Sequence, residues 1–266
     1  MTSTSWQARA GHAGSAPLRW LAGWWRILFF GASLLVLAAT PSSYSRETRA
    51  ALVHHVYVDT APILAWFTTL CALLTLVITR IVIVTALSYG LSQYALEMVI
   101  RVLVLELIPL TAALFVSLRC TIPNGAALAA MRRSGEFDRL ARGGRDPVVT
   151  QALPRALAGI YATITLAALS CVVALVLAYF GVYGFTLAGV PAYTRVFGHV
   201  FNPAVSLIFV LKTLLFSLAV AIIPMASGIF DVEGGTSREG AALQGLVRMF
   251  VVLLVLEGAS LAGNYY

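Results

Sequence analysis

The sequence predicts an all-α integral membrane protein with about five transmembrane helices, an N-terminal interfacial helix and a short cytoplasmic helix. Of its 266 residues, 60% are hydrophobic and only 11% are charged, too few charges for the surface of a soluble domain. Several apolar runs reach the roughly 20 residues that cross a hydrocarbon core of about 30 Å. They leave little of the chain for a separate soluble domain.

The N-terminal region divides into two parts. Residues 1–17 are rich in Gly, Ser and Ala and are predicted to be mobile. Residues 18–40 are predicted to form a helix in the headgroup plane, because Arg19 and Arg26 share one helical face beside several tryptophans. A cleaved signal peptide is the alternative, since a basic start and an apolar core precede small residues and Pro41. Whether this helix lies flat, dips in or spans stays open.

Five apolar runs follow as predicted transmembrane spans. They are about Thr60–Ser88, Met98–Leu118, Ala156–Phe180, Val205–Ile229 and Leu246–Ala262. Three charged residues inside them, Glu106, Lys212 and Glu257, each cost on the order of 3 kcal/mol at bilayer depth, so each should face protein or a wet cavity. One interpretation is structural: Lys212 pairs with Glu106 or Glu257 and ties helices together.

The arginines orient the spans. The connection between the second and third spans is rich in arginine, whereas the next connection holds only Arg195 with His199. The positive-inside rule therefore places Gly125–Arg155 in the cytoplasm, and five spans place the C-terminus outside. Five spans are awkward for a closed pathway, so a symmetric pair of chains is expected.

Residues 125–155 form the most polar internal segment. Leu128 and Met131 share one helical face, Phe137 and Leu140 share another, and Gly143–Gly144 stops the helix. A short helix with apolar anchors among arginines suits a groove on another protein. A solvated loop held inside by its charge explains the composition equally well.

Several function classes are excluded or disfavoured by residue type. A P-loop needs a glycine-rich turn before its lysine, and no glycine closely precedes Lys212, the single lysine of the chain, so ATP hydrolysis by that route is excluded. Nucleic acid is an unexpected partner because aromatic residues do not interleave with the arginines. No metal or cofactor motif is found, and the adjacent His54 and His55 are interpreted as interfacial residues. The lone cysteines are expected to be small buried hydrophobes: Cys71, Cys120 and Cys171.

An ordered series of short motifs runs through the second span and the cytoplasmic segment. It comprises Glu106-x-x-Pro109, Arg119, Met131-Arg132, Asp146-Pro147 and Pro154-Arg155. In this order and spacing, over roughly residues 55–264, the chain resembles the MlaE/YrbE permease family of bacterial lipid-transport ABC systems.

The resemblance implies a single permease domain over residues 18–266, in a multi-pass protein of the bacterial inner membrane. Its implied partners are a separate ABC ATPase chain that binds the ATP, a second permease copy, a periplasmic MCE-domain protein and phospholipid; such systems serve outer-membrane lipid asymmetry. The implied coupling residues are Met131, Arg132, Glu136, Phe137, Leu140 and Asp146. The implied lipid-cavity residues are Tyr89, Glu106 and Lys212, with Glu257 as an intramembrane structural charge.

The chain departs from the family pattern in its coupling helix. Gly135 and Glu136 stand where the family has Glu and then Gln, Pro123 interrupts the small-residue step, and Ala127 replaces an acid that often follows. These changes leave a second hypothesis, a non-transporting scaffold or degenerate permease paralogue. An integral lipid-modifying enzyme is a third, disfavoured because clustered acids and nucleophiles are missing.

Overall fold

The computed structural model describes residues 4–265 apart from 92–93 and 231–237, and every regular element in those residues is helical. The long helices are α1 (Thr4–Ala39), α2 (Arg46–Ser88), α7 (Leu153–Tyr183), α9 (Pro203–Phe230) and α10 (Arg238–Tyr265). The short helices are α3 (Ala95–Val99), α4 (Ile108–Val116), α5 (Ile122–Arg133), α6 (Glu136–Arg142) and α8 (Val190–Val200). There are 3-10 turns at Pro41–Ser43 and Leu187–Gly189, and π-helical segments η3 (Ile100–Leu107), η4 (Ser117–Thr121) and η5 (Val148–Ala152). Six helical stretches of the described residues are long and apolar enough to cross a membrane, which confirms the all-α membrane class.

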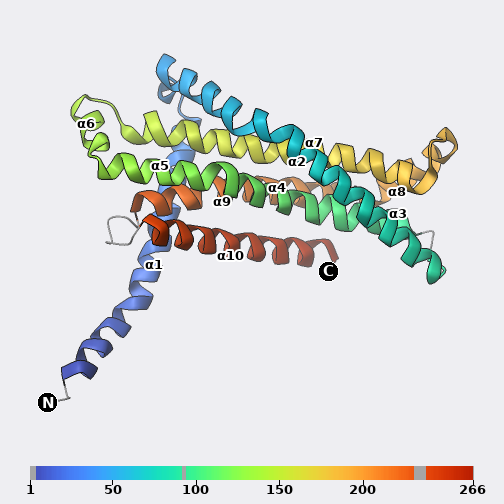
Figure 1. Ribbon diagram of the computed structural model, residues 1–266, viewed down its shortest axis with the longest axis horizontal. Helices are drawn as coiled ribbons and strands as arrows, with labels where there is room; N and C mark the ends of the chain where they lie inside the picture. Colours follow the sequence, from blue (N-terminus) through green and yellow to red (C-terminus); the bar gives the residue numbers. More distant parts are fainter. Residues whose placement is uncertain (1–3, 92–93, 231–237, 266) are drawn as a thin grey trace.

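The long helices form a bundle with two distinct ends (Figure 1). In both views α6 lies at one end with the start of α2, and α8 lies at the other with the end of α2. Helices α9 and α10 pack on each other, and α7 packs on α2 and α9. The chain passes back and forth along the bundle from α2 to α10, as alternating spans require.

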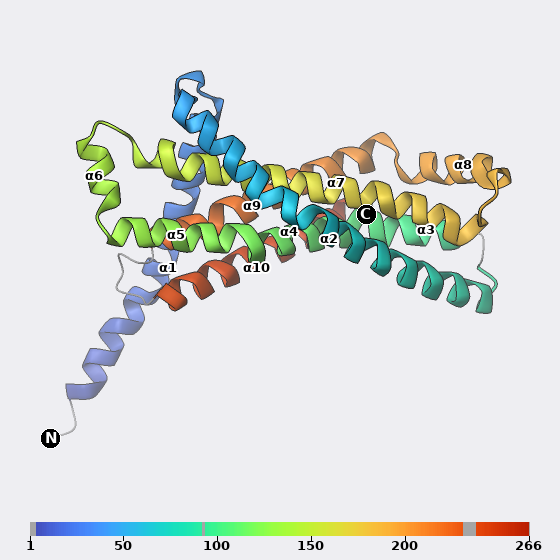
Figure 2. The ribbon, with the colours of Figure 1, turned by 45° about the horizontal axis from the view of Figure 1, so that its top comes forward.

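Helix α1 runs across the bundle near the α6 end and projects beyond it (Figure 2). Ile27, Phe30 and Leu34 are buried against the bundle, with the ring of Phe30 edge-on to that of Phe230 at 5.8 Å. The opposite face exposes large apolar side chains such as Trp25. By length and hydropathy Leu21–Ala39 also satisfies the needs of a span. Its transverse course is the one expected of an interfacial helix. The helix begins at Thr4, so residues 4–17 are helical, whereas residues 1–3 lie outside the described part of the chain.

The second span is much longer than Met98–Leu118. Helical structure is continuous from Ala95 to Arg133, and the charged segment begins as the last turns of this span. The reason lies in the prolines: Pro109, Pro123 and Pro154 each open an α-helix directly after a π-helical segment. Proline lacks an N–H and clashes with the preceding turn, and a wider π turn accommodates it without ending the helix.

The predicted single helix in residues 125–155 is two helices. Helix α5 ends at Arg133, and Gly135 adopts a left-handed conformation with φ of +72° before α6 begins. A residue with a Cβ disfavours this conformation, so glycine permits the sharp turn. The predicted stop after α6 is confirmed, since α6 ends at Arg142 and Gly144 is also left-handed.

Helices α5 and α9 touch through backbone rather than side chains. A Cβ placed on Gly228 would lie 2.4 Å from the carbonyl oxygen of Gly125, and one placed on Gly125 would lie 2.6 Å from that of Pro224. Only glycine permits such an approach. Because α5 carries the first part of the arginine-rich segment 125–155 and α9 carries Lys212, this contact joins the two parts of the molecule that the sequence singled out.

Helix α8 was not predicted from the sequence. It lies after the third span, and its Tyr193 donates from its hydroxyl to the carbonyl of Leu175 at 3.1 Å. The rings of Tyr179 and Tyr193 meet edge-on at 5.3 Å. Burial raises the pKa of Tyr193. This helix closes the end of the bundle opposite α6.

Candidate functional site: a buried charge cluster and a cytoplasmic helix pair

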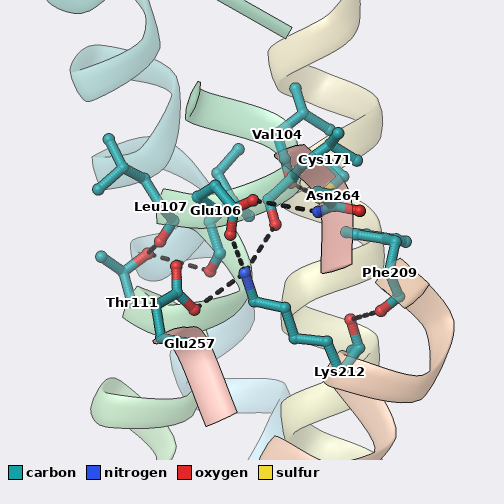
Figure 3. A network of polar contacts seen from close by, with 12 residues as sticks. Val104, Glu106, Leu107, Thr111, Cys171, Phe209, Lys212, Glu257 and Asn264 are labelled. Carbon is teal, nitrogen blue, oxygen red and sulfur yellow. Dashed lines mark hydrogen bonds and ion pairs between the residues drawn. The ribbon is translucent and has the colours of Figure 1, made fainter. Parts of the chain in front are cut away.

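Lys212 of α9, Glu106 of η3 and Glu257 of α10 meet inside the bundle (Figure 3). Lys212 is 4% exposed, and its Nζ pairs with Oε2 of Glu106 and, at 2.9 Å, with Oε2 of Glu257. It also donates to the carbonyl oxygen of Leu105 at 3.2 Å. Lys212 therefore forms two hydrogen bonds, to Glu106 and Leu105, and an ion pair with Glu257. Lys212 thus pairs with both carboxylates rather than with one.

Pro109 explains why the Leu105 carbonyl accepts a side-chain donor. Leu105 lies in the π-helical segment η3, and Pro109, four residues later, has no N–H with which to form an α-helical bond to its carbonyl. A buried carbonyl without a donor costs about 1–3 kcal/mol, and Lys212 supplies one. The Glu106-x-x-Pro109 motif therefore has a local physical role, since it places a carboxylate and a vacant carbonyl on one turn.

The cluster sets two carboxyl groups against one ammonium group. Glu106 is 7% exposed and the side chain of Glu257 is 14% exposed, so two largely buried carboxylates face a single ammonium. Asn264 donates from Nδ2 to Oε1 of Glu106 at 3.4 Å, which adds a fourth polar residue. The cluster spans three helical segments and ties them together. Asn264 was missed from the sequence because a single amide near the chain end carries no periodic signal.

Tyr89, the third predicted cavity residue, lies apart from the cluster. It follows the last residue of α2 and is 76% exposed. The described polar contacts of Lys212, Glu106 and Glu257 do not include it. The structure therefore brings together Glu106 and Lys212 but leaves Tyr89 at the bundle end.

The α5–α6 pair presents charges, not apolar anchors, to the outside. Phe137 was predicted to anchor this segment to a partner, but it is only 8% exposed and belongs to the hydrophobic core. Met131 packs against the same core, and Leu140 is half-buried. Asp138, Arg139 and Arg142 are exposed. The amphipathic pattern was recognised correctly, but its apolar face is turned toward the bundle.

Electrostatics at the ends of α6 favour a stable helix. The first turn carries Glu136 and Asp138, and the last turn carries Arg139 and Arg142, so both ends complement the helix dipole. Each favourable end charge stabilises a helix by about 0.3–1 kcal/mol. This short helix is therefore supported locally, although it holds only seven residues.

Asp146 has a capping role at the start of the next helical stretch. Its Oδ1 accepts from the backbone N–H of Val148 at 2.8 Å, and its carbonyl accepts from the hydroxyl of Thr150 at 3.0 Å. The turn after α6 is further tied to α2 by an exposed ion pair between Arg145 and Glu47 at 3.2 Å. The position of Asp146 thus fixes the entry into η5 and α7.

A cavity of about 620 Å³ lies where α1, α5, α6 and α9 meet. Phe30, Phe137 and Phe230 form apolar walls, and the guanidinium of Arg132 lies 5.8 Å from the ring centroid of Phe230. Arg132 is therefore engaged with the bundle rather than extended away from it.

A second polar network, unpredicted from the sequence, lies between α2, α5 and α7. Asn124 donates from Nδ2 to Oδ2 of Asp59 at 3.0 Å, and Cys120 Sγ lies 3.3 Å from the Asp59 carbonyl. Buried Arg155 donates to the backbone and side-chain oxygens of Gln151 at 2.7 and 2.8 Å. The sequence signal for this network was Asp59, an acidic residue directly before a long apolar run. The predicted burial of all three cysteines is confirmed.

Comparison with protein families gives one match. A family model described as Permease MlaE matches residues 52–261, which is most of the chain. The matched range contains the three charged residues of the cluster and the whole 125–155 segment. The comparison with curated proteins gives no match.

Proposed function

We propose, from the premise that this chain belongs to the MlaE permease family, that it moves phospholipid through the membrane for exchange with an MCE-domain partner. Membership makes it the multi-pass membrane component of an ABC-type transporter, which works with an ATPase. The observation that carries the lipid proposal is the charge cluster of Glu106, Lys212 and Glu257. Such a cluster inside a membrane bundle marks a path for a polar group.

The mechanism follows from how the cytoplasmic end connects to the cluster. Helix α6 is joined through Gly135 to α5, and α5 continues without a break into η3, which carries Glu106. Helix α5 also touches α9 through the backbones of Gly125 and Gly228. A push on α6 by the ATPase therefore shifts Glu106 directly, and Lys212 through α9. The cluster opens or closes as its helices move apart or together.

In this proposal the closed arrangement is a resting state. Lys212 is enclosed by two carboxyl groups and the Leu105 carbonyl, so a lipid phosphate gains access to the lysine only when a carboxyl group moves away. Helix separation driven by ATP supplies that exchange of partners. A second copy of the chain completes the wall of the path, and the proposed membrane is the bacterial inner membrane.

The test is a reconstitution of the chain with its ATPase in liposomes that carry fluorescent phospholipid, with an MCE-domain protein as acceptor. ATP should accelerate lipid transfer, and Lys212→Ala should slow transfer per molecule of folded complex, with the yield of folded complex measured alongside. The matched control is Arg80→Ala, since Arg80 is an exposed charge on α2 away from the cluster. ATP hydrolysis without any lipid transfer in the wild type would reject the proposal. Loss of ATPase association would favour the scaffold hypothesis, to which the turn at Gly135 lends some support.

A further inference from the structure

Three buried oxygen atoms in or beside the charge cluster form no hydrogen bond within the described residues. They are Oε2 of Glu257, which lies 2.9 Å from Lys212 Nζ as an ion pair, Oδ1 of Asn264 and Oγ of Ser260. The amide nitrogen of Asn264 already donates to Glu106, so its oxygen remains as an acceptor. Ser260 is 7% exposed, and it lies three residues, about one turn, from Glu257 on α10. The groups that lack partners are thus able to accept hydrogen bonds, and they lie next to the surplus carboxylate.

The charges of the cluster also indicate that a positively charged partner is missing. Glu106 and Glu257 together hold two negative charges, and Lys212 balances one of them. An unbalanced charge among buried groups is strongly unfavourable. Lys212 directs its Nζ at Glu106, Glu257 and the Leu105 carbonyl, and no hydrogen bond joins it to Ser260 or Asn264 within the described residues. A cationic hydrogen-bond donor would satisfy both the charge and the acceptors.

The bundle also provides space and a suitable depth. A cavity of about 200 Å³ between α9 and α10 is lined by Lys212, Ser260 and apolar side chains, including those of Leu211 and Leu256. Lys212 lies nine residues into α9, about 14 Å from the start of that helix at 1.5 Å per residue. This depth is within one leaflet of a hydrocarbon core of about 30 Å. A headgroup drawn into the bundle from the leaflet at the α8 end would meet the cluster.

We infer that the surplus carboxylate of the Glu106–Lys212–Glu257 cluster selects phospholipids whose headgroup carries a primary ammonium group. The ammonium of such a headgroup donates to Glu257, Ser260 and Asn264, and supplies a positive charge beside the second carboxylate. A lipid whose headgroup charge is phosphate alone adds a second negative charge and is disfavoured. This inference rests on the proposed function, since it names the class of lipid that the same path accepts.

The test measures which lipid the protein keeps. The full chain, in complex with its ATPase, is incorporated into liposomes of equal parts phosphatidylethanolamine and phosphatidylglycerol, extracted in mild detergent and analysed for bound lipid by mass spectrometry. Wild-type protein should retain phosphatidylethanolamine over phosphatidylglycerol by about tenfold, equivalent to about 1.4 kcal/mol. Glu257→Gln, which removes the surplus charge, should reduce the ratio to about one. The matched control is Glu97→Gln, because Glu97 lies in the span that carries Glu106 but pairs with Arg101 outside the cluster.

A milder variant covers the case in which Glu257→Gln does not fold. Ser260→Ala removes a hydroxyl that has no partner and leaves all charges in place. It should keep phosphatidylethanolamine ahead but lower the ratio by about threefold. Wild-type protein that retains both lipids equally would overturn the inference, and would indicate that a proton balances the second carboxylate.

Failure of the inference is distinguishable from failure of the proposed function. Selective retention of phosphatidylethanolamine without ATP-driven transfer would reject transport and leave the binding site standing. Transfer of both lipids at equal rates, with equal retention, would reject the selectivity and leave transport standing.

Discussion

Replacing Lys212 by methionine should destabilise the protein more than removing all three charges of the cluster together. Lys212→Met leaves Glu106 and Glu257 buried without a counter-charge, and deprives the Leu105 carbonyl of its donor. Removing one partner from a buried ion pair costs about 3–5 kcal/mol. The triple variant Glu106→Gln, Lys212→Met, Glu257→Gln leaves no charge behind. Replacing all members of a buried ion cluster by uncharged residues often leaves the free energy of unfolding unchanged.

For a chain of this size, about 2–4 °C is lost for each kcal/mol, so Lys212→Met should melt about 6–20 °C below the wild type. The triple variant should melt within a few degrees of it. The assay is the loss of the monodisperse peak in size-exclusion chromatography after heating, followed by tryptophan fluorescence. Equal melting of Lys212→Met and the wild type, or equal destabilisation of the single and triple variants, would show that the cluster is not held by its charge balance.

Three further perturbations test other parts of the structure. Gly228→Ala should destabilise the fold by about 1–3 kcal/mol because its Cβ would lie 2.4 Å from the Gly125 carbonyl oxygen, whereas Gly258→Ala, which meets nothing within 4 Å, should be neutral or stabilising in the same melting assay. Asn124→Ala should cost about 1–3 kcal/mol because buried Asp59 loses its 3.0 Å donor, and a combined Asp59→Ala, Asn124→Ala variant should recover part of that loss. Charge reversal at Arg139 and Arg142, both exposed on α6, should lower ATPase co-purification at least tenfold. Charge reversal of the control, Arg195 on α8, should leave co-purification unchanged. If both variants retain the ATPase equally, α6 is not part of the docking surface.

Much of the architecture was predictable from apolar run length. For the last three spans, the majority of the boundaries were predicted to within a few residues. A run such as Val205–Ile229 has polar or helix-breaking neighbours on both sides, which mark its ends in the sequence. The predicted second span ended too early, at Leu118, because a charged residue and a proline, Arg119 and Pro123, are typical of the end of a transmembrane helix. The π-helical segment η4 instead carries the helix through that proline to Arg133.

The sequence by itself determined the membrane class, the arginine-rich end and the identity of the buried charges. Each of these follows from local properties, namely hydropathy, charge bias and the cost of an ion in hydrocarbon. It also gave the amphipathic pattern around Phe137, although not the direction that this face takes.

Only the tertiary structure decided which groups meet. Lys212 pairs with two carboxylates, and that of Glu106 lies more than one hundred residues away in the sequence. The pairing depends on how α9 packs against η3 and α10. The burial of Phe137 depends on the turn at Gly135, which directs α6 back against the hydrophobic core of the bundle. Hydropathy measures the preference of each residue for lipid or water, but it contains no term for the partner that a helix face will find. That partner is fixed by packing between segments distant in the chain.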